Sequence, residues 1–133
     1  MTEQNWRDLP AGRELDRLVA EKAGYRVQHD HPDYILWSAD GDFVVRQPDE
    51  YLAWRHVPHY STSVDAALTL PLNPGEYGWA LKIVPDFSGG LVWAMIIDDA
   101  GQTVSRCIQP ARLIALAMVQ TWLAWKEANG HAG

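Results

Sequence analysis

The stretch LVWAMII, residues 91–97, decides the fold class of this chain, because seven apolar residues follow one another without a polar interruption. A strand that faces water on one side alternates apolar and polar residues, whereas a strand covered on both faces is apolar throughout. Residues 91–97 therefore predict a strand with structural layers above and below it. Helices elsewhere in the chain are expected to supply these layers.

The neighbouring segments predict further antiparallel strands. In residues 77–84, large apolar side chains alternate with smaller or polar ones, which is typical of a strand with one buried face. A turn at residues 98–101 leads into a third strand at residues 102–107, and the three strands form a meander. Upstream, a small hairpin is predicted from short strands at residues 25–27, 34–37 and 43–46.

Two helical patterns precede the meander. Residues 10–23 repeat apolar residues every three or four positions, place charged residues such as Asp16 on the outward face, and end before Gly24. A short middle helix is predicted to follow Ser61 or Thr62, whose side chains can accept from its free amides. Both segments are therefore expected to lie on the sheet as covering helices.

The last helix is predicted to begin at Pro110 and to end near Ala128. Apolar residues nearly encircle it, so we expect it at the centre of the core or in an interface. Trp122 and Trp125 lie three positions apart on it, and with Trp6 they are candidate anchors for a homodimer. Large aromatic residues at helical spacing are otherwise typical of the core of a single chain.

Together these elements predict one α+β domain over residues 1–133, with flexible ends at residues 1–9 and 129–133. The expected architecture is a three-layer α/β/α sandwich, in which three helices cover a mostly antiparallel sheet of about four to six strands. A chain of 133 residues is long enough for one hydrophobic core and short for two ordinary domains.

The composition excludes several classes of function. Eleven Lys and Arg against seventeen Asp and Glu give a formal net charge of −6, which argues against general nucleic-acid binding and against an anionic membrane surface. A single cysteine, Cys107, excludes an internal disulfide and a thiolate-rich zinc site. The N-terminus has no secretory pattern, and no apolar run reaches the roughly 18 residues of a membrane span. We therefore expect a cytoplasmic protein, and no motif indicates a cofactor.

A candidate ligand site lies in residues 46–60, where cationic and aromatic residues precede a helix. The candidate residues are Arg46, Trp54, Arg55, His59 and Tyr60. The two rings offer flat surfaces for a base, and the three basic side chains offer donors for phosphate, so a small nucleotide-type anion suits them. In the alternative interpretation, Trp54 and Tyr60 pin the loop to the core and Arg55 is solvated, which explains every residue type without a ligand.

His29, His31 and Asp33 are candidates for a metal site, because two imidazoles and a carboxylate can meet a divalent ion from a bent loop. With His56 they would serve a metal-assisted hydrolase; the alternative is a solvated loop. Other catalytic patterns are not favoured. Cys107 has no charged helper on its own face of a strand, and no nucleophile elbow surrounds the serines.

Several segments, in their order along the chain, resemble a known family. They are residues 13–22 ahead of Gly24, Pro58-His59-Tyr60-Ser61-Thr62, Ala66-Ala67, and the alanine- and leucine-rich helix after Ala111-Arg112. In these segments the chain is similar to the phage ABA-sandwich domain, a family of small phage and prophage proteins with α-β-α layers. Ser63 and Pro110 depart from the family's pattern at two helix starts. The resemblance implies the sandwich fold and a phage context, and it carries no catalytic residue to this chain.

The expected function is therefore that of a small phage or prophage accessory protein that acts by binding and not by catalysis. Its expected partner is a host protein or a small anionic, nucleotide-type ligand, and a homodimer is an expected form. The sequence leaves two alternatives open, which are a metal-assisted hydrolase and a structural virion component.

Overall fold

A computed structural model describes residues 6–72, 76–84 and 90–130 of the chain. These residues form six strands, four α-helices and two short 3-10 helices. The strands are β1 (Arg26–Asp30), β2 (Asp33–Trp37), β3 (Phe43–Gln47), β4 (Tyr77–Val84), β5 (Leu91–Asp98) and β6 (Thr103–Pro110). The helices are α1 (Arg13–Ala23), α2 (Glu50–Trp54), α3 (Val64–Ala67) and α4 (Ile114–Gly130), with the 3-10 helices η1 (Trp6–Asp8) and η2 (Ala111–Leu113).

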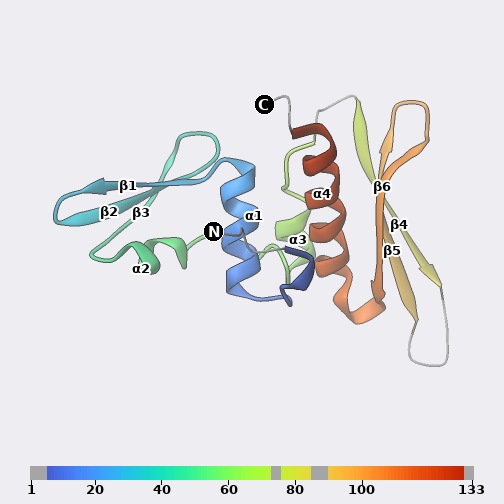
Figure 1. Cartoon of the computed structure of the whole chain (residues 1–133), viewed down its shortest axis with the longest axis horizontal. Helices are drawn as coiled ribbons and strands as arrows, with labels where there is room; N and C mark the ends of the chain where they lie inside the picture. The colour runs from blue at the N-terminus through green and yellow to red at the C-terminus, as the bar shows by residue number, and fades with distance from the viewer. Residues whose placement is uncertain (1–5, 73–75, 85–89, 131–133) are drawn as a thin grey trace.

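The strands form two separate three-stranded antiparallel sheets, β1-β2-β3 and β4-β5-β6. In the first sheet Leu36 lies between Val27 and Val45, and in the second Ala94 lies between Leu81 and Cys107. The prediction of a single sheet with four to six strands is therefore wrong. The long connection that contains α2 and α3 carries the chain from β3 in one sheet to β4 in the other (Figure 1).

The two long helices, α1 and α4, lie between the two sheets, whereas α2 lies against the first sheet (Figure 1). α1 and α4 are side by side in the middle of the molecule, with the β1-β2-β3 sheet beyond α1 and the β4-β5-β6 sheet beyond α4. This order of layers is the reverse of a sandwich in which helices cover both faces of one sheet. The structure confirms the α+β class and does not confirm the predicted three-layer α/β/α arrangement.

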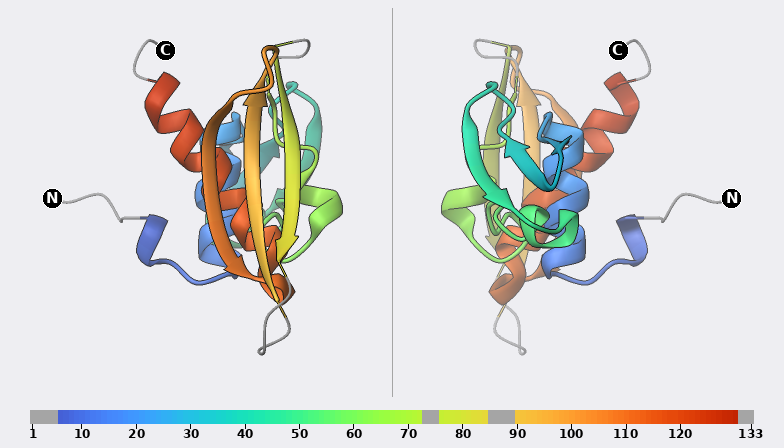
Figure 2. Two further views of the ribbon diagram at one scale, coloured as in Figure 1. Left: turned by 90° about the vertical axis from the view of Figure 1, so that its right-hand side faces the viewer. Right: turned by 90° about the vertical axis from the view of Figure 1, so that its left-hand side faces the viewer.

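β5 is covered on one face only. Val92, Ala94 and Ile96 are fully buried against α4, whereas Trp93 and Met95, on the opposite face, are only partly buried. Within the described part of the chain no element lies over that second face (Figure 2). The predicted cover on both sides is wrong, because α2 packs against the first sheet and α1 lies on the far side of α4.

α4 forms the centre of the core, as its apolar surface predicts. Trp122 is fully buried, and its indole Nε1 donates to the carbonyl of Pro71 at 2.9 Å. The buried hydroxyl of Thr121 lies 2.9 Å from the carbonyl oxygen of Ala94, which connects α4 to β5 and satisfies a polar group inside the core. Neither α4 nor any other helix in the described residues is long and apolar enough to cross a lipid bilayer.

α1 ends before Gly24, as predicted. Gly24 has a left-handed φ of 116°, and its N–H donates to the carbonyl of Ala20 at 3.1 Å. A Cβ at this position would lie 3.3 Å from the Cβ of Ala39, in the turn between β2 and β3. Glycine is therefore favoured by its backbone conformation and by the close approach of this turn.

The start of α3 differs from the prediction. The N-cap is Ser63, whose hydroxyl oxygen accepts from the N–H of Ala66 at 3.2 Å. The predicted caps, Ser61 and Thr62, precede it, and α3 extends only over Val64–Ala67. Ser61 is buried and belongs to a hydrogen-bond network with Asp16, which is described below.

The N-terminal residues 6–9, predicted to be flexible, pack against the core. Trp6 and Leu9 are buried, and Arg7 forms an ion pair with Glu127 of α4 at 3.0 Å. The hydrogen bond from Arg7 holds the pKa of the Glu127 carboxyl below its usual range. The outermost parts of the predicted flexible ends, residues 1–5 and 131–133, lie outside the described residues.

Candidate functional site

The aromatic candidates of residues 46–60 face the core. Trp54, at the end of α2, has an exposed fraction of 7%, and Tyr60, in the loop that follows, has 3%. The Cζ of Arg17 on α1 lies 4.9 Å from the centre of the Trp54 ring. Burial raises the pKa of the Tyr60 phenol above its usual range, and hydrogen bonding to Tyr25 adds to this effect. The geometry favours the interpretation in which both rings pin the loop, because neither presents an open face to a base.

The cationic candidates lie in different surroundings. Arg46 on β3 forms ion pairs with Asp30 at 3.1 Å and with Asp33 at 3.4 Å, at the turn of the β1–β2 hairpin. Arg55 and His59 have exposed side chains in the loop after α2. The two carboxylates beside Arg46 oppose the binding of a phosphate there, since like charges repel at this separation.

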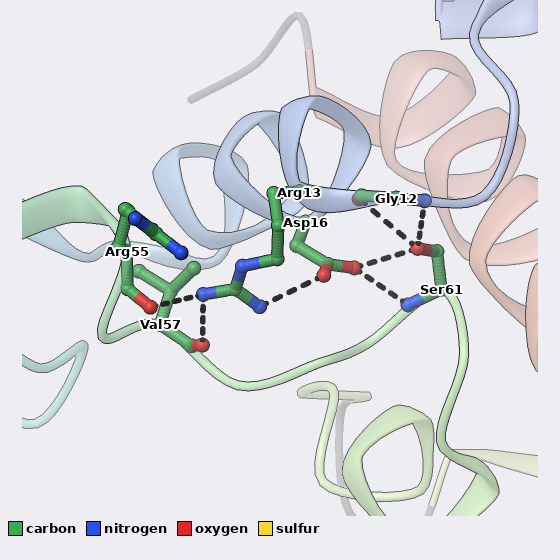
Figure 3. Close-up of polar contacts among 6 residues, drawn as sticks. All are labelled: Gly12, Arg13, Asp16, Arg55, Val57 and Ser61. Carbon is green, nitrogen blue, oxygen red and sulfur yellow. Dashed lines mark hydrogen bonds and ion pairs between the residues drawn. The ribbon is translucent and has the colours of Figure 1, made fainter. Parts of the chain in front are cut away.

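A buried polar network fixes the loop after α2 to the start of α1 (Figure 3). At its centre is Asp16, a fully buried carboxylate on α1. Asp16 Oδ1 accepts hydrogen bonds from the N–H and from the hydroxyl of Ser61, at 2.8 and 2.7 Å. The hydroxyl oxygen of Ser61 accepts from the N–H of Gly12 at 2.9 Å, one residue before α1 begins. The network therefore connects the first turn of α1 to the loop.

Arg13 completes the network on the other side of the carboxylate. Its Nη1 donates to Asp16 Oδ2 at 2.9 Å, and its Nη2 donates to the carbonyl oxygens of Val57, at 2.8 Å, and of Arg55. The planar guanidinium reaches three acceptors in one plane, which the single ammonium of a lysine does not do. Both oxygens of the buried carboxylate have donors, so the network stabilises the loop instead of offering a free base.

Sequence reasoning missed this network. The helical pattern placed Asp16 on the outward face of α1, and this prediction is wrong because the side chain is fully buried. Asp16 directly follows the buried Leu15, so it lies at the border of the apolar face, where spacing alone does not assign a side. Its partner Ser61 lies 45 positions away, and no local signal in the sequence connects the two.

The predicted metal-site residues make separate contacts. The ring of His29 stacks on that of Tyr34 with centroids 4.6 Å apart, and Asp33 is paired with Arg46. The rings of His29 and His31 lie 5.9 Å apart, edge to face. Within residues 6–72, 76–84 and 90–130, no three His, Cys, Asp or Glu side chains are grouped as metal ligands would be. The metal-assisted hydrolase stays a prediction from the sequence.

Cys107 is half-buried on the face of β6 that is turned toward α4. Burial raises the pKa of its thiol, while a hydrogen bond with Thr121 acts in the opposite direction. The thiol is therefore protonated at neutral pH and is a weak nucleophile. Cys107 contributes to the contact between helix and sheet.

No described element lies over the face of the β4-β5-β6 sheet that points away from α4, called here the outer face (Figure 2). The strand register assigns its members, which are mainly aliphatic or aromatic. They are Ala80, Lys82 and Val84 on β4, Leu91, Trp93, Met95 and Ile97 on β5, and Thr103, Arg106 and Ile108 on β6. Ile108 is among the exposed large apolar residues of the chain.

Both charged members of the outer face are cationic and border the same indole. Lys82 lies opposite Trp93 in the register, and the Cζ of Arg106 lies 5.1 Å from the centre of the Trp93 ring. The outer face, as defined above from the described residues, contains no carboxylate, although the chain as a whole has a net charge of −6. The charge of this surface is thus opposite in sign to that of the molecule.

A shallow groove on the exposed side of α1 is a weaker candidate. It is lined by Leu9, Glu14, Arg17, Leu18 and Glu21. Arg17 is paired with Glu21 at 2.8 Å, so these polar groups bind each other instead of pointing together at a ligand.

Comparison of the chain with protein-family models, with curated proteins and with solved structures gave no match. The geometry of the outer face therefore carries the functional proposal.

Proposed function

We propose that this chain is a small binding protein that docks another protein on the outer face of the β4-β5-β6 sheet. The observation that carries the proposal is the uncovered apolar surface centred on Trp93 and Met95. Apolar side chains in this number are normally covered in a folded chain, and a contiguous apolar patch with a polar border is typical of an interaction site.

The size of the outer face supports a protein partner. Three strands spaced about 4.8 Å apart and eight residues long, at about 3.4 Å per residue, give a flat footprint of roughly 400 Å². The surface of protruding side chains exceeds this projection, and a standard interface buries about 800 Å² on each partner. The outer face therefore supplies a large part of one interface, and it exceeds the needs of a small molecule.

The charge of the outer face specifies the partner. Lys82 and Arg106 border the apolar centre, and no carboxylate interrupts it. A second outer face would bring cations together, whereas an apolar surface bordered by Asp or Glu would pair with them. We therefore assign a heterologous partner with an apolar centre and an acidic border. The resemblance to the phage ABA-sandwich domain supports a host protein as this partner and the cytoplasm of an infected cell as the place of binding.

The nucleotide-type ligand is the less favoured form of binding. The rings of Trp54 and Tyr60 are buried, and Arg46 is occupied by two aspartates. Binding through the loop would require these contacts to be given up, whereas the outer face is open as it stands.

A peptide-display selection tests the proposal. We expect the folded chain to select peptides that combine aromatic or aliphatic residues with Asp or Glu, and Trp93→Asp to weaken their binding at least about tenfold. Phe43→Asp, an exposed position on the other sheet, is the matched control and should leave binding unchanged. Circular dichroism would verify that both variants are folded. Selected peptides that bind Trp93→Asp as tightly as the unaltered chain would contradict the proposal.

A further inference from the structure

β4 is an edge strand with an exposed backbone. In the described residues β4 pairs with β5 and with no other strand, and its register with β5 is unbroken over eight residues. β6, at the opposite edge, shifts register against β5 between Ile96 and Ile97. β4 contains no proline and one charged residue, Lys82. It therefore has few of the features that protect a sheet edge from pairing with another strand.

Two large apolar side chains of β4 are exposed, although they point to the same side of the sheet as the β5 residues that α4 buries. Leu81 and Ile83 lie opposite Ala94 and Val92, which are fully buried, yet their own exposed fractions are 42% and 64%. Trp79, on the same face of β4, packs against the core. The helical layer thus covers the beginning of β4 and leaves its second half uncovered at the edge of the sheet.

We propose that β4 pairs antiparallel with β4 of a second copy of this chain, about a two-fold axis at Leu81, so that two three-stranded sheets become one of six strands. The inference does not rest on the proposed docking face. The proposed dimer covers the edge of the sheet, because Leu81 and Ile83 of each copy meet apolar side chains of the other copy.

Faces and charges restrict the register. Opposite residues of two antiparallel strands point to the same face of the sheet. The covered and uncovered faces of the two copies therefore match only when odd-numbered residues of one β4 are opposite odd-numbered residues of the other. With Leu81 on the axis, Leu81 lies opposite its own copy, Ile83 lies opposite the partner's Trp79, and Lys82 lies opposite the partner's Ala80. A shift that places Lys82 on the axis would set two lysines directly opposite, which is unfavourable.

The expected dimer is reversible. The Leu81 register joins about seven residues of each β4 with alternating hydrogen-bonded pairs, over a length of about 24 Å. An interface of this kind is below the standard size, and we therefore expect a dissociation constant in the micromolar range.

Sedimentation velocity on the full chain measures the dimer directly. Between about 1 and 100 μM, a range that spans micromolar dissociation constants, the unaltered chain should shift from monomer to dimer. Ile83→Lys should keep the chain monomeric over this range, while Ile108→Lys, an exposed position on β6, should not. A monomer at every concentration, or an equal loss of the dimer in both variants, would overturn the proposal.

Disulfide trapping tests the register. In a Cys107→Ser background, Leu81→Cys should give a covalent dimer under mild oxidation, because opposite residues of an antiparallel pair lie within the Cα separation that a disulfide spans. Ile108→Cys on the outer face should remain uncross-linked, and equal cross-linking at both positions would reject the edge-to-edge arrangement. The monomeric Ile83→Lys variant should still bind the acidic, apolar peptides described above, so each proposal can fail without the other.

Discussion

Ser61 holds the carboxylate of Asp16 with two donors at once, its backbone N–H at 2.8 Å and its hydroxyl at 2.7 Å. The two residues lie 45 positions apart, and together they fix a loop against the first turn of a helix. A buried carboxylate loses its hydration, so these donors and the guanidinium of Arg13 replace the water that Asp16 gives up.

We predict that Asp16→Ala lowers the free energy of unfolding by about 3 to 5 kcal/mol, because it leaves Arg13 and the donors of Ser61 without their buried acceptor. Urea denaturation followed by circular dichroism measures the change. Glu14→Ala, an exposed acidic position on the same helix, is the control and should change stability by less than about 0.5 kcal/mol. A similar small effect for Asp16→Ala would show that the network contributes nothing to stability.

We predict that Trp54→Ala lowers the free energy of unfolding. The ring is buried among core residues, so its removal should cost about 3 to 5 kcal/mol of unfolding free energy. Thermal denaturation would measure the loss, and Tyr51→Ala, an exposed aromatic position on the same helix, provides the comparison. If nucleotides stabilise the unaltered chain and Trp54→Ala abolishes this effect at unchanged stability, the ring is a ligand contact and the prediction is wrong.

We predict an alkaline loss of stability that depends on Tyr60. Because the pKa of Tyr60 is raised in the folded chain, the unfolded chain loses this proton first as the pH rises through about 10, the ordinary value for tyrosine. Stability that is present below pH 10 therefore falls above it, by up to about 1.4 kcal/mol per pH unit for one proton.

The measurement is the urea midpoint of the unaltered chain and of Tyr60→Phe, compared at pH 8 and at higher pH. The variant should lose less stability with rising pH, whereas Tyr51→Phe, at an exposed position, should follow the unaltered chain. Parallel pH curves for Tyr60→Phe and the unaltered chain would be inconsistent with a raised pKa.

We predict that the thiol of Cys107 reacts slowly in the folded protein. Burial raises its pKa, so the thiolate fraction near neutral pH is smaller than that of a free cysteine. Labelling by a thiol reagent should be at least about tenfold slower than in the urea-unfolded chain. Thr121→Val removes the hydroxyl that lowers this pKa and should slow labelling further. Equal rates in the folded and unfolded chains would contradict the raised pKa.

Local signals in the sequence predicted the individual elements well. Gly24 marked the end of α1, and the apolar run at residues 91–97 marked a strand. The arrangement of the strands was not predictable in the same way, because a strand that is apolar on both faces favours a cover on each but does not specify which element, or which second chain, supplies it. α4 covers one face of β5, and no described element covers the other face.

The candidate loop shows a second limit. The sequence offered Trp54 and Tyr60 either as ligand contacts or as residues that pin the loop, because a sequence does not distinguish a ring that stacks on a ligand from one that packs into its own core. Asp16 was assigned to the wrong side because the position borders the apolar face of α1, and the donor that justifies its burial comes from a distant loop. Long-range polar pairs of this kind leave no periodic signal.

The central place of α4 has a consequence for cooperativity. α4 supplies side chains to both hydrophobic clusters, Trp122 to the larger and Met118 to the smaller. On its other side α4 lies next to α1, which lies between it and the first sheet (Figure 1). Opening of the β4-β5-β6 sheet would expose α4 to water, and opening of the β1-β2-β3 sheet would expose Leu36 and the α1 side chains that belong to the same larger cluster. The two sheets, which share no strand pairing in the described chain, should therefore unfold together, and amide hydrogens in β2 and β5 should exchange with the same free energy of opening.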